Sequence, residues 1–157
     1  MLESINRQIP GFLPAYLLLA KGKLAVGNDL DASLAITKVL QIDSRNEEGS
    51  ILNAMIRNKK KDYDAAMNSL QEAISINFKI RENPLFMLIK GEIEYAMEQY
   101  VTAEETMVQA VALPAVKRKS VEDPTAKKFK ILSFLEKDRC SIFLLLAKCY
   151  TKNKKSK

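Results

Sequence analysis

Residues 61–77 read KDYDAAMNSLQEAISIN, and this stretch decides the fold because it recurs along the chain. Residues 27–43, GNDLDASLAITKVLQID, align with it without a gap, 34 positions earlier. Residues 98–114, EQYVTAEETMVQAVALP, align with it again, 37 positions later. In each copy an alanine is followed after four residues by Ile, Leu or Met, and after three more by Val or Ala. This spacing marks one face of a helix, so the recurrence predicts an all-α fold of repeated helices.

A period of 34 residues is typical of the tetratricopeptide repeat (TPR), in which antiparallel helices A and B form one unit. We expect an α-α superhelix, or TPR solenoid, with about three full repeats and half-repeats at both ends. Because the fourth helix A is followed by no helix B, we interpret the chain either as a segment of a longer solenoid or as a truncated variant. The expected divisions are the tail of a preceding helix B at 1–12, repeats at 13–46, 47–80 and 81–117, a basic inserted linker at 118–138, and helix A of an incomplete fourth repeat with a lysine-rich tail at 139–157.

Small residues at the expected helix crossings let two backbones approach closely. Helix A of the third copy departs from the usual pattern, because Lys90 stands where leucine is common. The alternative to a repeat fold is an ordinary helical bundle that happens to contain these alanines. The predicted inter-helix packing residues, which share a small side chain and a recurring register, are Ala20, Ala32, Ala66, Ala73, Gly91, Ala103, Ala110 and Ala147.

The composition argues against an enzyme. The 157 residues include no histidine, which removes His-based acid–base catalysis, Ser-His and Cys-His pairs, and His-ligated metal sites. No phosphate-binding glycine loop, CxxC or HExxH motif occurs, and Cys149 is expected to be a small buried residue. We therefore expect no catalytic residues, cofactor, metal or small-molecule substrate. No apolar run approaches the roughly 18 residues that span a bilayer, so no membrane span is expected.

Positive charge is concentrated near the end of the chain. The chain carries a net charge of +6, but residues 117–157 alone contain 13 Lys or Arg and 4 Asp or Glu. A basic helical-repeat nucleic-acid binder is therefore an alternative function. Repeats that read RNA carry a recurring pair of polar base-reading residues, and nothing comparable recurs here. The sequence thus favours protein partners over nucleic acid.

The helix A residues that face away from helix B line a concave groove in such solenoids. One hypothesis is that a partner helix or extended peptide lies in this groove, because its predicted residues are unusually apolar for a solvent-exposed surface. The other is that the apolar members belong to the core, since a register error of one residue exchanges the two faces. The predicted groove residues are Leu17, Lys21, Leu24, Ile51, Met55, Leu88, Glu92 and Tyr95.

Several strings resemble one family in matching order. They are NFKIRENPL at 77–85, then Leu88-Ile89-Lys90 and Ala112-Leu113-Pro114, with FLPAYLLLAK at 12–21 upstream and RCSIFL at 139–144 downstream. In these strings the chain resembles the tetratricopeptide repeat protein 21 family, which supplies the large repeat subunit of intraflagellar transport complex A. The resemblance implies a non-enzymatic scaffold segment in the cytoplasm and at the cilium or basal body. Its implied partners are other subunits of that complex, and its implied roles are retrograde ciliary transport and receptor entry. A generic TPR adaptor outside cilia is the alternative.

Overall fold

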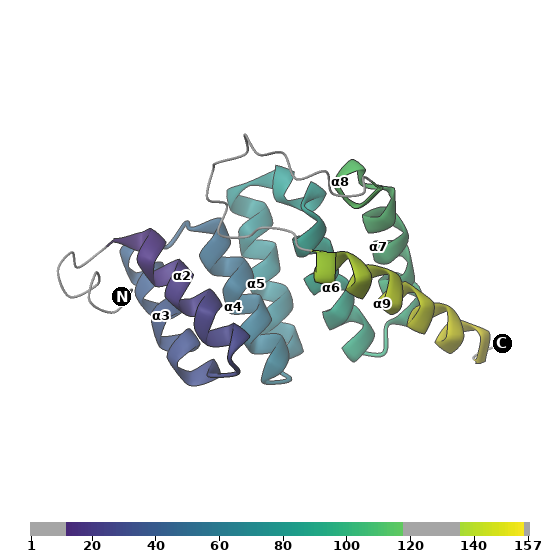
Figure 1. Cartoon of the computed structure of the whole chain (residues 1–157), viewed down its shortest axis with the longest axis horizontal. Helices are drawn as coiled ribbons and strands as arrows, with labels where there is room; N and C mark the ends of the chain where they lie inside the picture. The colour runs from purple at the N-terminus through teal and green to yellow at the C-terminus, as the bar shows by residue number, and fades with distance from the viewer. Residues whose placement is uncertain (1–11, 118–135, 156–157) are drawn as a thin grey trace. The chain divides into compact units, whose positions relative to one another are not determined.

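The computed structural model describes residues 12–117 and 136–155, and all regular structure in these residues is helical (Figure 1). The chain divides into two compact units, Met1–Phe78 (unit 1) and Lys79–Lys157 (unit 2). Unit 1 contains two antiparallel pairs, α2 (Leu13–Ala25) with α3 (Asp29–Ile42), and α4 (Glu47–Lys59) with α5 (Tyr63–Ile76). After the short 3-10 helix η1 (Phe78–Glu82), unit 2 contains α6 (Pro84–Ala96), α7 (Tyr100–Ala112), α8 (Pro114–Lys117) and α9 (Glu136–Lys155).

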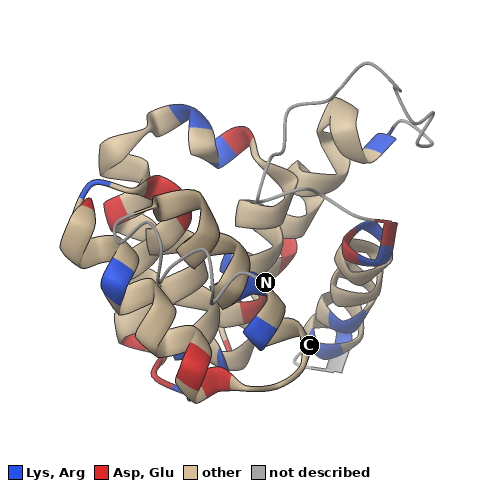
Figure 2. Cartoon of the chain, turned by 60° about the vertical axis from the view of Figure 1, so that its left-hand side comes forward, with Lys and Arg blue, Asp and Glu red and all other residues tan. Residues whose placement is uncertain are grey.

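The predicted all-α fold of antiparallel helix pairs is confirmed. The pairs α2/α3, α4/α5 and α6/α7 fall within residues 13–46, 47–80 and 81–117, which were predicted as three repeats. The last helix was predicted within residues 139–157, and the described part of α9 covers Glu136–Lys155. Glu136 and Asp138 place acidic side chains in its first turn, where the helix dipole favours negative charge (Figure 2). Residues 1–11, from the predicted preceding helix B, and residues 118–135, from the predicted linker, lie outside the described part of the chain.

Asparagine or aspartate begins most of the repeat helices. The side chain of Asn46 accepts a hydrogen bond of 2.8 Å from the backbone N–H of Gly49 at the start of α4. Asn28, Asp62 and Asn83 cap α3, α5 and α6 in the same way. These hydrogen bonds satisfy backbone N–H groups that have no acceptor inside the helix. The capping residue in the local sequence therefore determines where each of these helices begins.

The turn between helix A and helix B has the same backbone form in all three pairs. Gly27, Lys61 and Glu98 stand 34 and 37 residues apart, and each has a positive φ, of 78°, 63° and 63°. The following residue donates its backbone N–H five residues back, as Asp62 does to the carbonyl of Arg57 at 3.0 Å. This is a Schellman-type ending, which favours glycine at the positive-φ position. Only the first turn has glycine there.

Lys61→Gly is therefore expected to stabilise unit 1, and Gly27→Ala to destabilise it. The left-handed conformation costs a residue with a Cβ atom about 1 kcal/mol, although added glycine also increases the entropy of the unfolded chain. Lys61→Gly should gain about 0.5 kcal/mol, and Gly27→Ala should lose about 1 kcal/mol. Urea unfolding followed by circular dichroism measures both changes. Equal stability of the two variants would contradict this account.

The predicted packing residues other than Ala147 are buried. Ala20, Ala32, Ala66, Ala73, Ala103 and Ala110 are each 0% exposed, and Gly91 is also buried. A larger buried residue also recurs on the second helix of each pair: Ile36 in the first pair, Leu70 in the second and Met107 in the third. The recurring register therefore corresponds to a recurring core.

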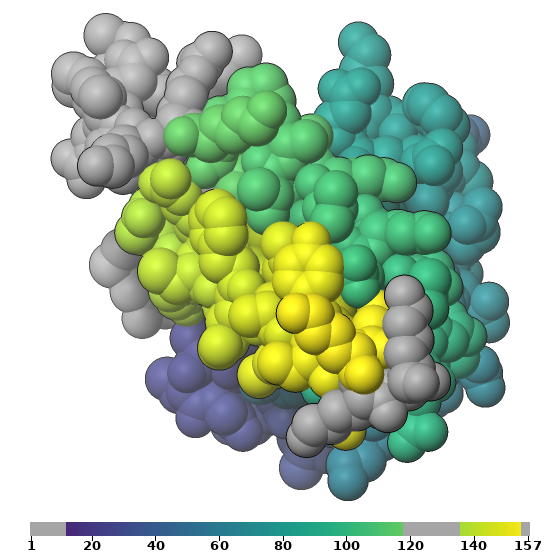
Figure 3. Space-filling view, turned by 90° about the vertical axis from the view of Figure 1, so that its right-hand side faces the viewer, coloured from purple at the N-terminus to yellow at the C-terminus, as the bar shows by residue number. Residues whose placement is uncertain are grey.

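Ala147 departs from that prediction, because it is exposed. The buried stripe of α9 is formed by Ile142, Leu145 and Cys149, which are spaced three and four residues apart. Ala147 lies two residues from both Leu145 and Cys149, which places it on the opposite side of the helix. α9 packs against α6 and α7, and no other described helix of unit 2 covers the side that carries Ala147. Figure 3 shows α9 at the surface of the described part of unit 2.

Candidate protein-binding surface

The predicted groove residues of unit 1 divide between core and surface. α2 and α4, the first helices of two successive repeats, contact each other. Leu17, Leu24 and Ile51 are buried, so these three residues are part of the core. Lys21 and Met55 are half-buried and border the surface between the two helices. The apolar stripe continues into the core because Leu17 and Leu24 share the α2 face of Ala20 at three- and four-residue spacing.

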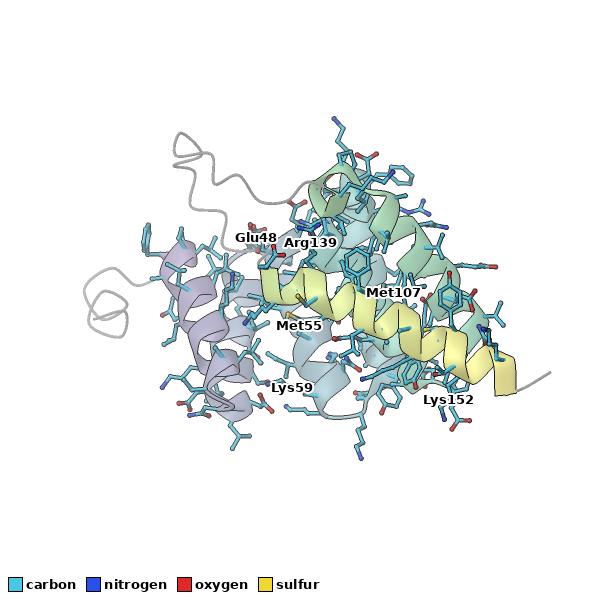
Figure 4. The ribbon with its side chains drawn as sticks, turned by 45° about the vertical axis from the view of Figure 1, so that its right-hand side comes forward. Glu48, Met55, Lys59, Met107, Arg139 and Lys152 are labelled. Atoms are coloured by element: carbon cyan, nitrogen blue, oxygen red, sulfur yellow. The ribbon has the colours of Figure 1, made fainter. Side chains whose placement is uncertain are left out.

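Charged groups surround the accessible part of this surface. Partial burial raises the pKa of the Glu48 carboxyl, and the neighbouring Glu47 raises it further, whereas Lys21 of α2 lowers it. Lys59 donates from its Nζ atom to the backbone carbonyl of Leu24 at 3.3 Å and to Asp29 Oδ1 at 3.0 Å. Figure 4 shows Glu48, Met55 and Lys59 spaced along α4. The accessible part of this surface in unit 1 thus combines the half-buried Met55 side chain with charged groups of both signs.

The predicted groove residues of unit 2 also differ in exposure. Leu88 is buried, whereas Glu92 is exposed. Tyr95 is half-buried and meets Tyr100 edge to face, with ring centroids 5.1 Å apart. Tyr95 therefore supports the α6–α7 turn. The Nζ atom of Lys152 on α9 lies over the ring of Tyr100, 5.5 Å from its centroid. Lys152 is labelled near the end of α9 in Figure 4. Leu88 belongs to the core, so Glu92 is the most accessible of the three predicted residues.

The pKa of the Glu92 carboxyl is raised. Desolvation by the surrounding protein is the main cause, Asp138 raises the pKa further, and Lys148 lowers it. Both charged neighbours come from α9, so α6 and α9 together determine the electrostatic potential at this point of the surface.

Glu92→Gln is expected to change how the stability of unit 2 depends on pH. Because the folded-state pKa is raised, the contribution of Glu92 is fully present below the unfolded-state pKa and is lost as pH rises through the folded-state pKa. The glutamine variant should therefore gain stability relative to the wild type between about pH 4 and about pH 7. Exposure of the carboxylate keeps the gain below about 1 kcal/mol. Urea unfolding at both pH values measures it, and a difference that shrinks on raising the pH would contradict the expectation.

A buried polar cluster between α6 and α7 was not predicted. Glu94 is 2% exposed and forms an ion pair with Lys90. Thr106 donates to Glu94 Oε2 at 2.7 Å and accepts from Lys90 Nζ at 2.9 Å. At equivalent positions in unit 1, Asn53 donates to Ser69 Oγ at 3.2 Å. In both repeats, a polar residue on helix A and another 16 positions later on helix B were the sequence pattern that could have predicted these hydrogen bonds.

The remaining chemistry-bearing groups form no reaction centre in the described residues. Cys149 is buried, as predicted, and desolvation raises the pKa of its thiol, whereas Cys140 is exposed. Within residues 12–117 and 136–155, no three His, Cys, Asp or Glu side chains are grouped so that they could hold a metal ion. No helix in those residues is long and apolar enough to cross a membrane.

Comparisons with known proteins agree with a repeat fold. The crystal structure of MamA has a TM-score of 0.61 at 16% identity, covering 99% of this chain and 86% of that one. The family model described as tetratricopeptide repeat protein 21 ARM repeat matches residues 78–157. Mouse tetratricopeptide repeat protein 21B is 28% identical over 98% of this chain, and human 21B is 29% identical over 93%. The chain spans only 11% of the length of each of these two relatives.

Antiparallel helix pairs that repeat with buried alanines at the crossings define a helical-repeat protein of the TPR class. The family match covers half of the chain, and the relatives align over nearly all of it. The chain belongs to the tetratricopeptide repeat protein 21 family. It is a repeat segment of that family and not an enzyme.

Proposed function

We propose that this chain is a scaffold segment that holds protein subunits together in intraflagellar transport complex A, and so acts in retrograde ciliary transport and receptor entry. The observation that carries the proposal is the family match over residues 78–157 together with relatives that align over almost the whole chain. The proposed location is the cytoplasm, at the cilium and its basal body. The proposed partners are other protein subunits, not nucleic acid.

The binding residues proposed for unit 1 are the half-buried members of its groove. Lys21 and Met55 border the α2–α4 surface, and Glu48 adds a negative charge beside Lys21. A partner helix or extended segment would place apolar side chains against Met55 and a carboxylate near Lys21. In unit 2 the corresponding proposed residues are Glu92 and Tyr95.

Co-purification from ciliated cells tests this function. A tagged form of the chain is expected to bring other subunits of intraflagellar transport complex A with it. The double variant Lys21→Glu with Met55→Glu should lose them while keeping its helix content by circular dichroism. Asn68→Glu, at an exposed position of α5, is the control variant that should retain them. Recovery of only non-ciliary proteins would instead support a generic TPR adaptor.

A further inference from the structure

A groove lies between α3 and α4 in unit 1, on residues that the α2–α4 surface does not include. Its cavity has a volume of about 460 Å³. Both walls belong to unit 1, so two successive repeats of the described chain complete it. We call it the α3–α4 groove, and its lining residues are Ser33, Ile36, Thr37, Leu40, Gln41, Asn53, Ile56, Arg57, Lys60 and Asp62.

Polar side chains form a row along each wall of the α3–α4 groove. The row on α3 is Ser33, Thr37 and Gln41, and the row on α4 and the residue after it is Asn53, Arg57 and Lys60. Successive members stand three or four residues apart, so each row follows one side of its helix. Between the rows, Ile36 and Ile56 are buried and Leu40 is half-buried, which makes the floor of the groove apolar. The row on α3 is about 12 Å long, which matches about four residues of an extended chain.

The charged groups of the groove favour an anionic ligand. Its lining has two basic residues, Arg57 and Lys60, and one acidic residue, Asp62. Asp62 Oδ1 accepts from the backbone N–H of Ala65 at 3.4 Å, and Asp62 Oδ2 pairs with Arg57 Nη1 at 3.4 Å. Because this ion pair is long and partly exposed, Asp62 compensates the positive charge only in part.

One edge of the Arg57 guanidinium lacks an acceptor. Its Nε atom is buried and has no hydrogen-bond partner among the residues that the structure describes. Such a donor is unfavourable until an acceptor meets it. A ligand carboxylate accepts two parallel hydrogen bonds from a guanidinium, and the weak pair with Asp62 lets the Nε edge turn toward the groove. Arg57 is therefore the residue that would receive an acidic side chain.

Two neutral residues of the rows are held in place by the chain. Thr37 donates its hydroxyl to the backbone carbonyl of Ser33 at 2.9 Å, and Asn53 donates to Ser69 Oγ at 3.2 Å. The hydroxyl oxygen of Thr37 and the amide oxygen of Asn53 keep lone pairs that can accept. An extended peptide presents backbone N–H groups along its length, so these two oxygens suit a peptide better than a single small anion.

We propose that the α3–α4 groove binds an extended segment of a partner protein, with an Asp or Glu side chain of that segment paired with Arg57. Residues 118–135 of this chain suit the groove poorly, because they contain five basic and two acidic residues. The acidic residues of α3, α5 and α7 lie in helices, so a second folded copy does not offer them in an extended segment. This proposal depends neither on the ciliary role nor on the α2–α4 surface.

Binding of short peptides to the full chain tests the proposal. The probe is a mixture of acetylated, amidated pentapeptides with Glu at the centre and Val, Leu, Ser or Thr elsewhere. The matched mixture has Gln at the centre. In two-dimensional NMR of the ¹⁵N-labelled chain, the Glu mixture should shift the backbone amide signals of Thr37, Asn53 and Arg57. It should bind at least about threefold more tightly than the Gln mixture, and added salt should reduce this difference.

Variants of the chain locate the binding site. Arg57→Gln should weaken binding of the Glu mixture at least about threefold and remove the difference between the two mixtures. Arg45→Gln makes the same change at an exposed arginine of unit 1 outside the groove and should have no effect.

A second pair of variants blocks the groove without changing its charge. Thr37→Phe should weaken binding of both mixtures, whereas Thr102→Phe, at an exposed position of α7, should weaken neither. Circular dichroism should show equal helix content in all the variants. The proposal is overturned if the two mixtures bind the wild type equally, if Arg57→Gln binds like Arg45→Gln, or if inorganic phosphate shifts the groove signals and neither mixture does.

Discussion

Lys90→Leu is expected to destabilise unit 2 by about 3 kcal/mol, even though leucine is the usual residue at this repeat position. The substitution leaves the carboxylate of Glu94 buried without its cation. Thr106 still donates one hydrogen bond to Glu94, but a hydroxyl group does not compensate a full charge. Because the Lys90 side chain is 30% exposed, the loss should fall at the lower end of the range for broken buried ion pairs.

A second substitution separates lost charge pairing from lost packing. Adding Glu94→Gln to Lys90→Leu removes the unpaired charge while keeping an acceptor for Thr106, so it should recover part of the stability. Glu136→Gln, which breaks the exposed pair between Glu136 and Arg139, is the matched control and should cost under about 0.5 kcal/mol. Urea unfolding measures all three. A loss for Lys90→Leu as small as that of the control would show that the buried pair contributes little.

The repeat register made the helix pairs predictable from the sequence. Ala32, Ala66 and Ala103 are buried at equivalent crossings because a helix pair is a local structure, with its caps and turns encoded within the same 34 to 37 residues. The cap at Asn46 follows from the same local sequence, whereas the positive φ at Lys61 does not, because glycine is the residue that favours that conformation. A recurring residue pattern therefore predicts those helices and turns whose contacts lie within one repeat.

The exposure of individual surface residues was less predictable, because it depends on neighbouring helices. Leu17 and Leu88 were predicted to line a groove, but both are buried. Successive residues of a helix are rotated by about 100°, so a register error of one residue moves a side chain from the groove to the core. Ala147 was predicted to pack between helices, yet it is exposed among the described residues. Predicting the partners of Lys90 would have required the relative orientation of α6 and α7. The residue pattern of one helix does not contain that information.

Met107→Ala is expected to cost unit 2 about 3 kcal/mol, because Met107 is 0% exposed and its removal leaves a cavity against α6. The length of Met107 also explains why the third repeat has a glycine at the crossing. At the equivalent positions in unit 1 the second helices carry the shorter side chains Ile36 and Leu70, and the first helices carry Ala20 and Ala54.

Gly91→Ala should stabilise the Met107→Ala background more than the wild type. In the wild type the new Cβ atom would lie 2.5 Å from Met107 Cε and 3.4 Å from Leu145 Cδ2, so the clash offsets the gain of about 1 kcal/mol from replacing a helical glycine. In Met107→Ala the clash is gone and the added methyl group fills part of the cavity, so Gly91→Ala should stabilise that variant by about 1 kcal/mol or more. A double-mutant cycle by urea unfolding measures the coupling free energy. Additive effects would show that Met107 moves freely away from Gly91, and the close crossing would then not explain why this repeat has a glycine.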